Sequence, residues 1–222
     1  MIKNELQKRI LSSIILIPIA IFFIFQQTAF FGFFLSIFFL VTSYEWIKMN
    51  KINFLKIIGV CYLFFAFLFA YLLREKFTLG LLLLVLIICV FTDLGGYIFG
   101  KVFKGPKLIK ISPKKTYAGA IGGFILSLIA ALIYSKYTTI GTATFLNLSI
   151  WADITLNKIY FLFILVISLI SQIGDLIISY FKRLAKVKDT GSLLPGHGGL
   201  LDRLDGIIFA IPFSYLLLSN LR

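Results

Sequence analysis

The sequence has 222 residues, of which 60% are hydrophobic and 17% aromatic, and its formal net charge is +13. Soluble domains are nearer to half apolar, so this composition excludes an ordinary soluble domain and predicts an all-α, polytopic membrane protein. In such an apolar chain, the excess of basic residues is better explained by orientation in a bilayer than by binding to nucleic acid. Cys61 and Cys89 lie in apolar runs and offer neither a disulfide framework nor a metal site.

Apolar runs predict about seven transmembrane helices, with six to eight as the range. The runs cover residues 10–25, 29–43, 57–73, 78–100, 116–135, 159–181 and 205–220. Several runs are shorter than the ~20 residues that a span usually needs, and only three polar residues separate the first two. No small-x-small cleavage site follows the first run, so we expect an uncleaved first helix rather than a signal peptide.

The basic residues predict the orientation of these helices. With the N-terminus inside, 17 of the 22 Lys and Arg residues fall on the cytoplasmic side, as the positive-inside rule requires. The two long cytoplasmic loops, 101–115 and 182–204, carry most of the polar chemistry. We therefore divide the chain into N-terminal transmembrane helices over 1–75 and a catalytic transmembrane region with both loops over 76–222.

The sixth apolar run carries a polar stripe at helical spacing: Ser168, Gln172, Asp175, Ser179 and Lys182. Lipid penalises such a stripe, so it must face protein or a water-filled cavity. Two interpretations stay open for the serines and the glutamine, which could hydrogen-bond between helices or could line a functional site. A carboxylate within a span indicates function, so Asp175 is a candidate site residue.

The fourth run contains the segment DLGGYIFGKVFKG, which starts at Asp93. Asp93 is either the partner of a lysine or part of a polar site. Gly96 and Gly100 share its helical face, and their small size predicts close packing against another helix rather than chemistry.

The segment SPKKTYAGAIGG follows. Thr116 is placed to cap a new helix, and Lys114 and Lys115 flank the positive end of that helix, which would suit an anion such as phosphate. Gly119 and Gly123 are spaced for close approach of another helix or of a ligand. Two interpretations stay open here: phosphate binding, or positive-inside lysines together with a packing motif.

The most polar stretch, SLLPGHGGLLDRLDG, covers residues 192–206. Asp202 and Asp205 are three residues apart and share a helical face. Asp175 lies near the cytoplasmic end of the sixth run, at about the membrane depth where the seventh run begins. Oxygen ligands of this kind suit Mg²⁺, which binds a few carboxylates together with substrate phosphates. Gly198 and Gly199 predict a turn with backbone N–H groups available to an anion, and His197 predicts a turn or a phosphate contact.

The segment SYFKRLAKVKDTGSLLPGHGGLLDRLD, residues 179–205, resembles the signature of the phosphatidate cytidylyltransferase (CDP-diacylglycerol synthase) family. The resemblance extends over about 90–135 and 170–206. It implies an integral-membrane, all-helical, Mg²⁺-dependent enzyme that makes CDP-diacylglycerol and pyrophosphate from CTP and phosphatidate. It also implies a multi-pass protein of the bacterial inner membrane, with its active site facing the cytoplasm and with a homodimer as the assembly.

The resemblance also assigns roles to residues. Asp175 and Asp202 would bind the metal, with Asp205 nearby. The catalytic set would be completed by Lys182, Lys188 and Arg203. The remaining substrate-binding residues would be Asp93, Lys114, Lys115, Thr116, Ser179, Arg183, Asp189, His197, Gly198 and Gly199.

Two departures and two alternatives accompany this interpretation. Ala118 stands where the family usually has Glu, and the chain is short for a bacterial member, which predicts a trimmed N-terminal region. One alternative is a related CTP-dependent transferase acting on an ether-lipid phosphate or a polyprenol. The other is a cation transporter using Asp93 and Asp175, although a transporter would spread its acidic residues through the depth of the membrane.

Overall fold

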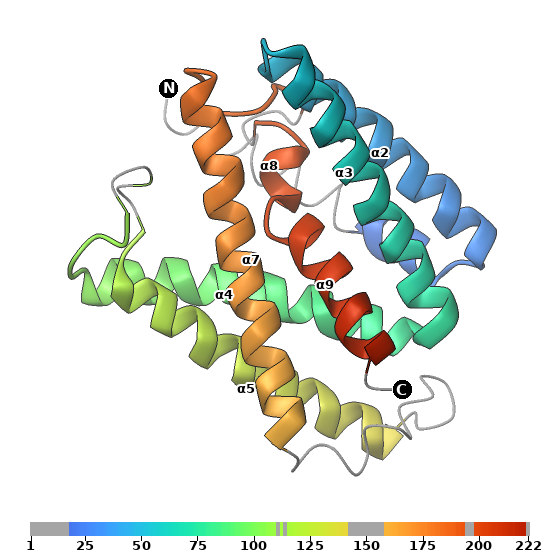
Figure 1. The fold of residues 1–222 in the computed structure, drawn as a ribbon. Coiled ribbons are helices and arrows are strands. Elements are labelled where there is room, and N and C mark those ends of the chain that lie inside the picture. Colours follow the sequence, from blue (N-terminus) through green and yellow to red (C-terminus); the bar gives the residue numbers. More distant parts are fainter. Residues whose placement is uncertain (1–17, 110–111, 113–114, 142–157, 194–197, 221–222) are drawn as a thin grey trace. The chain divides into compact units, whose positions relative to one another are not determined.

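The computed structural model describes residues 18–109, 112, 115–141, 158–193 and 198–220, and these residues are mainly helical (Figure 1). The helices are α2 (Thr28–Met49), α3 (Asn53–Leu72), α4 (Leu79–Phe103), α5 (Tyr117–Gly141), α7 (Lys158–Leu184), α8 (Leu201–Leu204) and α9 (Ile207–Asn220). A π-helical turn, Leu73–Phe77, links α3 to α4. No strand forms within these ranges, and Lys107 and Thr116 form an isolated antiparallel bridge.

The predicted all-α membrane architecture is confirmed. Five helical segments are long and apolar enough to cross a membrane: Thr28–Met49, Asn53–Phe77, Leu79–Phe103, Tyr117–Tyr137 and Lys158–Leu184. Helix α9 is apolar but shorter. Of the first predicted run, residues 18–25 are helical, and the rest lies outside the described residues. The total of seven spans stays a prediction.

Contacts divide the chain into two compact units that interleave in sequence. The first unit comprises residues 1–71 and 180–205, and the second comprises 72–179 and 206–222. Helix α7 belongs to the second unit up to Ser179 and to the first from Tyr180 onward. The functional division that we predicted between residues 75 and 76 stays a prediction.

In the first unit, Trp46 joins α2 to α3. Its indole N–H donates a 2.9 Å hydrogen bond to the Leu55 carbonyl, and its ring meets the Phe181 ring edge-on at 5.1 Å between centroids. Gly59 makes room for the indole, because a Cβ there would lie 1.8 Å from Nε1. An aromatic side chain with its one donor satisfied therefore fixes the end of α2.

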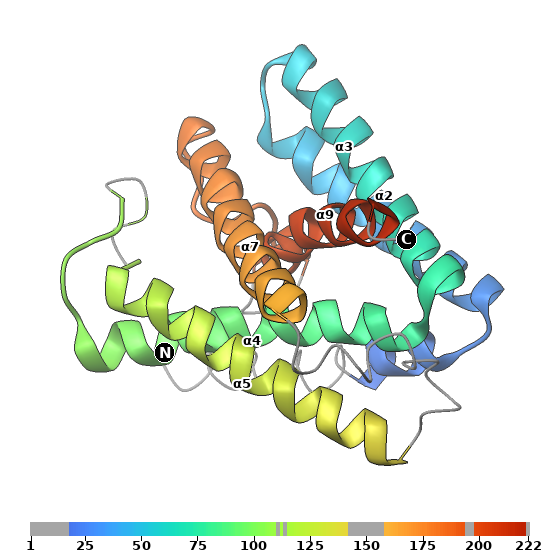
Figure 2. The same cartoon turned by 60° about the horizontal axis from the view of Figure 1, so that its bottom comes forward.

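In the second unit, α4 and α5 lie side by side, as both views show (Figures 1 and 2). Glycines make this approach possible: a Cβ at Gly95 would lie 2.4 Å from the Gly122 carbonyl oxygen, and one at Gly119 would lie 2.7 Å from that of Gly96. A packing role is confirmed for Gly119 and Gly123, whose added Cβ atoms would meet the backbone of α4. The tightest positions, Gly95 and Gly122, were not predicted, and a Cβ at Gly96 has no contact closer than 3.8 Å. This close contact brings the residues that follow Asp93 next to the start of α5.

Helix α7 packs against α4 and α5 through the polar stripe. The Ser168 hydroxyl lies 2.7 Å from the Thr92 hydroxyl of α4, and both side chains are buried. Gln172 Nε2 donates a 3.4 Å hydrogen bond to the Ala120 carbonyl of α5. Ser168 and Gln172 therefore hydrogen-bond between helices, and Gln172 also lines a cavity, so both of the interpretations left open hold for Gln172. The stripe faces protein or a cavity, as predicted.

Candidate active site

The second unit contains a cavity of about 210 Å³ between α4, α5 and α7. Its polar lining comes from Thr92, Asp93, Lys115, Thr116, Gln172 and Asp175. Five of these six are residues that the sequence had singled out, and Thr92 was not. Three separate segments of the sequence thus contribute polar side chains to one cavity.

The loop after α4 places Lys115 at this cavity. It turns at Lys104 and Gly105, whose φ angles of 50° and 90° are left-handed, a conformation that glycine adopts without strain. The Leu108 N–H then donates to the Lys115 carbonyl at 2.8 Å, and the Tyr117 N–H donates to the Pro106 carbonyl at 3.2 Å. These two hydrogen bonds join residues 115–117 to residues 106–108 and so fix the backbone at Lys115.

Thr116 caps α5 as predicted. Its hydroxyl accepts a 3.1 Å hydrogen bond from the Gly119 N–H, which satisfies one of the free donors of the first helical turn. Ala118 lies in the same turn, which contains no acidic residue, and its neighbours Gly119 and Ala120 line the cavity. The first turn of α5 therefore meets the cavity without the carboxylate that the resemblance implied.

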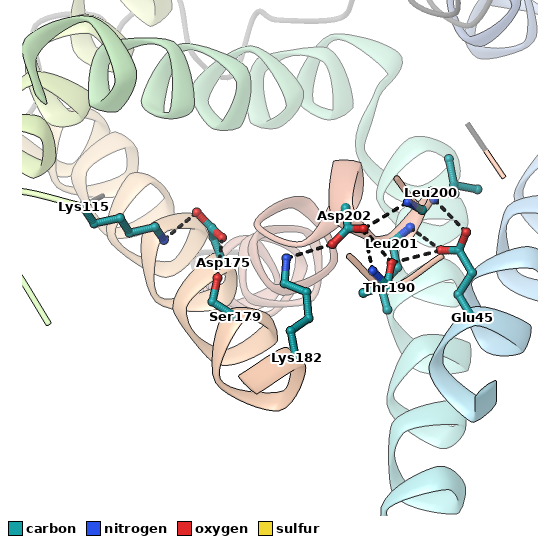
Figure 3. A network of polar contacts seen from close by, with 10 residues as sticks. Glu45, Lys115, Asp175, Ser179, Lys182, Thr190, Leu200, Leu201 and Asp202 are labelled. Atoms are coloured by element: carbon teal, nitrogen blue, oxygen red, sulfur yellow. Dashed lines mark hydrogen bonds and ion pairs between the residues drawn. The ribbon is translucent and has the colours of Figure 1, made fainter. Parts of the chain in front are cut away.

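Asp175 is paired on both of its oxygens (Figure 3). Lys115 Nζ lies 2.5 Å from Oδ2, and the Ser179 hydroxyl donates a 3.3 Å hydrogen bond to Oδ1. Both side chains of the ion pair remain about a quarter exposed, so the pair borders open space. Asp93 lines the same cavity and is also exposed. The predicted association of Asp93, Lys115, Thr116 and Asp175 is therefore present within one unit.

In the first unit, Asp202 is the centre of a second network (Figure 3). Lys182 Nζ donates to Asp202 Oδ1 at 2.8 Å, and the two side chains are only 13% and 9% exposed. Three donors converge on Oδ2: the Thr190 N–H at 2.8 Å, the Thr190 hydroxyl at 3.0 Å and the Gly199 N–H at 3.0 Å. The glycine amide that we expected to meet a ligand thus binds the carboxylate of this chain.

These donors change the acidity of Asp202. Burial raises the pKa of its carboxyl, but the hydrogen bond and charge of Lys182, with the backbone N–H groups of Thr190 and Gly199, outweigh burial. The pKa is therefore held below its usual value of 3.8. Asp202 is an anion at neutral pH, as a metal ligand or a partner of a cation must be.

Glu45 belongs to the same network, and sequence reasoning missed it. It lies on α2, is 3% exposed, and accepts hydrogen bonds from the backbone N–H groups of Leu200 and Leu201 at 2.9 and 2.8 Å. The signal was one carboxylate two residues after the predicted run 29–43, beside a tryptophan. An acidic residue at the end of an apolar run has many surface explanations, so this signal alone was weak.

The other predicted residues of this loop are distributed as follows. Gly198 has a φ of 87°, which confirms a glycine-dependent turn at that position. Arg183, Lys188, Asp189 and Arg203 are exposed, and Asp205 is half-buried. Lys114 and His197 lie outside the described residues. The exposed side chains of Arg183, Lys188 and Arg203 carry their charges without a desolvation penalty and are accessible to an incoming phosphate.

The donor chemistry fits Mg²⁺. Among the described residues, no group of three or more His, Cys, Asp or Glu side chains gathers in a way that could hold a metal ion. Mg²⁺ does not need such a group, because it usually binds one or two carboxylates with waters and substrate phosphates. Asp175 and Asp202 provide such oxygens. Their joint action on one ion stays a prediction, since they belong to different units.

Comparisons with known proteins agree with one another on the family of this chain. The model of the Cytidylyltransferase family matches residues 53–221. The chain is 37% identical over 185 residues to the phosphatidate cytidylyltransferase of Staphylococcus aureus strain COL, covering 81% of this chain and 66% of the relative. It is 35% identical over 188 residues to the protein of the same name from Staphylococcus haemolyticus, covering 82% and 67%. The chain thus spans about two thirds of the length of these relatives.

Proposed function

Because the chain belongs to the cytidylyltransferase family, we propose that it transfers the cytidylyl group of CTP to phosphatidate. A phosphate oxygen of phosphatidate attacks the α-phosphorus of CTP in line, and the bond from this phosphorus to the bridging α–β oxygen breaks. The products are CDP-diacylglycerol and pyrophosphate. A direct displacement needs no covalent enzyme intermediate, and the described residues contribute mainly positioning and charge.

One observation carries this proposal: each of two aspartates is held by a lysine. Lys115 pairs with Asp175 in the second unit, and Lys182 pairs with Asp202 in the first. Each pair offers a carboxylate to a cation and an ammonium to a phosphate, which are the two groups that phosphoryl transfer requires. Each lysine neutralises its carboxylate within its own network.

Mg²⁺ fits the aspartates as donors and would neutralise charge on the phosphates of CTP. Asp175 and Asp202 would hold it, and Lys115 and Lys182 would then be available to the phosphates. The exposed Arg183, Lys188 and Arg203 would add further cations for the pyrophosphate group. Ser179 would continue to orient Asp175 through its hydrogen bond.

The proposed setting is a bacterial cell membrane with the site on the cytoplasmic side. Several apolar helices indicate a multi-pass membrane protein, and the relatives are bacterial. The positive-inside pattern supports cytoplasmic placement of the loops that carry Lys115 and Asp202. A homodimer is supported by the family resemblance alone, and the mass of the protein–detergent complex would test it.

The deciding experiment supplies purified protein in detergent with Mg²⁺, labelled CTP and phosphatidate. We expect both CDP-diacylglycerol and pyrophosphate, and we expect Asp175→Asn and Asp202→Asn to lower the rate by at least about 100-fold. Glu75→Gln is the matched control, because Glu75 is an exposed carboxylate outside both networks. Absence of both products with wild-type protein would overturn the activity, whereas full activity of either Asn variant would overturn its metal role.

The lipid acceptor is tested in the same assay. Phosphatidate is replaced by an ether-lipid phosphate or by a polyprenol, with every other component kept. Preference for phosphatidate supports the proposal, and preference for either replacement would assign the chain to a related CTP-dependent reaction. Release of pyrophosphate at an equal rate without any lipid phosphate would contradict a phosphate oxygen of the lipid as the attacking group.

A further inference from the structure

Glu45 holds the segment that carries Asp202, although the two residues are far apart in sequence. Its Oε1 accepts from the Leu200 N–H at 2.9 Å, and its Oε2 accepts from the Leu201 N–H at 2.8 Å. These two amides immediately precede Asp202. The carboxylate therefore fixes the peptide planes from which the Asp202 side chain projects (Figure 3).

The position of Glu45 is energetically unfavourable for a negative charge. It lies near the C-terminal end of α2, where the helix dipole disfavours an anion, and it is almost completely buried. An ionisable residue at such a place in a membrane helix indicates function by default. The closest hydrogen-bond donors that stabilise this buried charge are the backbone N–H groups of Leu200 and Leu201. The charged form of Glu45 therefore depends on these residues keeping their positions.

Thr190 connects the two carboxylates. Its hydroxyl lies 3.0 Å from Asp202 Oδ2 and 3.4 Å from Glu45 Oε2, and its backbone N–H donates to Asp202 at 2.8 Å. A hydroxyl has one proton, and the shorter distance favours its donation to Asp202. One residue thus orients Asp202 while resting against Glu45.

Two glycines leave the space that Glu45 occupies. A Cβ at Gly199 would lie 2.6 Å from Glu45 Oε2 and 2.2 Å from the Thr190 hydroxyl oxygen. A Cβ at Gly191 would lie 2.7 Å from Glu45 Oε1. On the side of α2, Trp46 anchors the neighbouring position through its bond to Leu55. The carboxylate is therefore enclosed on both sides, and its position is determined by the fold.

We propose that Glu45 is a positioning residue that acts through Leu200, Leu201 and Thr190 to aim Asp202 at its cation. It lies before residues 53–221, which the family model matches. The role rests on the proposed function, because it concerns the metal and phosphate chemistry of Asp202. Replacement of residues that orient a metal ligand through hydrogen bonds typically changes metal affinity or activity by about 10- to 100-fold.

The test compares Glu45→Gln with wild type by two measurements. The first is hydrogen exchange of the 198–204 amides in metal-free detergent solution. We expect at least about tenfold faster exchange at one of Leu200 and Leu201, because the glutamine side chain keeps one accepting oxygen and its nitrogen cannot accept a hydrogen bond. The second is the Mg²⁺ concentration for half-maximal cytidylyl transfer, which should rise by about tenfold or more. Glu75→Gln should change neither value.

Thr190 supplies the second variant pair, which also covers poor folding of Glu45→Gln. Thr190→Val should raise the Mg²⁺ requirement, and Thr190→Ser, which keeps the hydroxyl, should restore it. Faster exchange with an unchanged Mg²⁺ requirement in both Glu45→Gln and Thr190→Val would reduce Glu45 to a purely structural role and overturn the proposal. Wild-type exchange in Glu45→Gln would overturn it as well.

The outcomes separate this proposal from the proposed function. If wild-type protein makes no product, the function fails, while the exchange rates still decide whether Glu45 orders the segment. If Asp202→Asn loses activity but Glu45→Gln keeps the wild-type Mg²⁺ requirement, only the positioning role fails.

Discussion

Lys182 and Asp202 form a 2.8 Å ion pair in which the carboxylate is bonded on both oxygens. The lysine occupies Oδ1, and the Thr190 and Gly199 donors occupy Oδ2. The side of Asp202 that faces the lysine is therefore the side that an incoming cation can take. The other side is committed to holding the carboxylate in place.

This pair predicts a specific dependence of stability on pH. Because the pKa of Asp202 is lower in the folded protein than its usual value of 3.8, its contribution is present above that value and is lost as the pH falls through the folded pKa. In metal-free detergent solution, Asp202→Asn should lower the free energy of unfolding by about 1–3 kcal/mol at pH 7. The difference from wild type should shrink as the pH falls below about 4.

Denaturation of both proteins across this pH range provides the measurement, with Glu75→Gln as the control for loss of one negative charge. A difference between wild type and Asp202→Asn that stays constant from pH 7 to pH 3 would contradict the assignment of the donors to the charged carboxylate.

The Lys115–Asp175 pair should matter far more to activity than to stability. Both side chains are about a quarter exposed, so their mutual coupling in unfolding should be below about 1 kcal/mol. Lys115→Met and Asp175→Asn should each slow cytidylyl transfer by about 100-fold or more, and the double variant should be no slower than the slower single one. A double-mutant cycle run on both unfolding and initial rates checks this. Strictly multiplicative rate losses would indicate that the two residues act independently.

The sequence predicted those features that depend on local periodicity. The polar stripe of α7 follows the 3.6-residue repeat, and the cap at Thr116 depends on an interaction with Gly119 three residues later. Glycines at helical spacing predicted close approach of another helix for the same reason, since the spacing alone places them on one face, but the spacing did not identify α4 and α5 as partners.

The features that were missed depend on contacts between distant parts of the chain. Glu45 and Thr190 are 145 residues apart, and no local pattern links them. The occupation of the Gly199 amide by Asp202 was missed because a free N–H and a paired one look the same in a sequence. The close approach of Gly206 to α7 was missed for the same reason, since only the structure shows that a Cβ there would lie 2.4 Å from the Ser171 hydroxyl oxygen.

Adjacent glycines on α4 should respond oppositely to the same substitution. A Cβ at Gly95 would lie 2.4 Å from the Gly122 carbonyl oxygen, a backbone atom, so Gly95→Ala must push α5 away. We expect a loss of about 1–3 kcal/mol in the free energy of unfolding. A Cβ at Gly96 has its nearest contact at 3.8 Å, so Gly96→Ala should be neutral or slightly stabilising through helix propensity. Equal unfolding midpoints for the two variants in detergent would contradict the close α4–α5 contact.

The buried Thr92–Ser168 contact predicts an asymmetric pair of variants. The Thr92 hydroxyl donates to the Ile88 carbonyl at 2.7 Å, so the Ser168 hydroxyl must be the donor in the 2.7 Å contact between them. Thr92→Val leaves a buried donor on Ser168 without that acceptor, whereas Ser168→Ala leaves Thr92 with its bond to Ile88. Thr92→Val should therefore cost more, by about 1 kcal/mol.

The double variant gives the decisive comparison. Once Ser168 is alanine, no donor is left unpaired, so adding Thr92→Val should cost about 1 kcal/mol less than it does in the wild-type background. Unfolding in detergent of the two single variants and the double variant measures this coupling. Additive losses in the free energy of unfolding would show that the two hydroxyls form no hydrogen bond between α4 and α7. The contact would then be a van der Waals contact only.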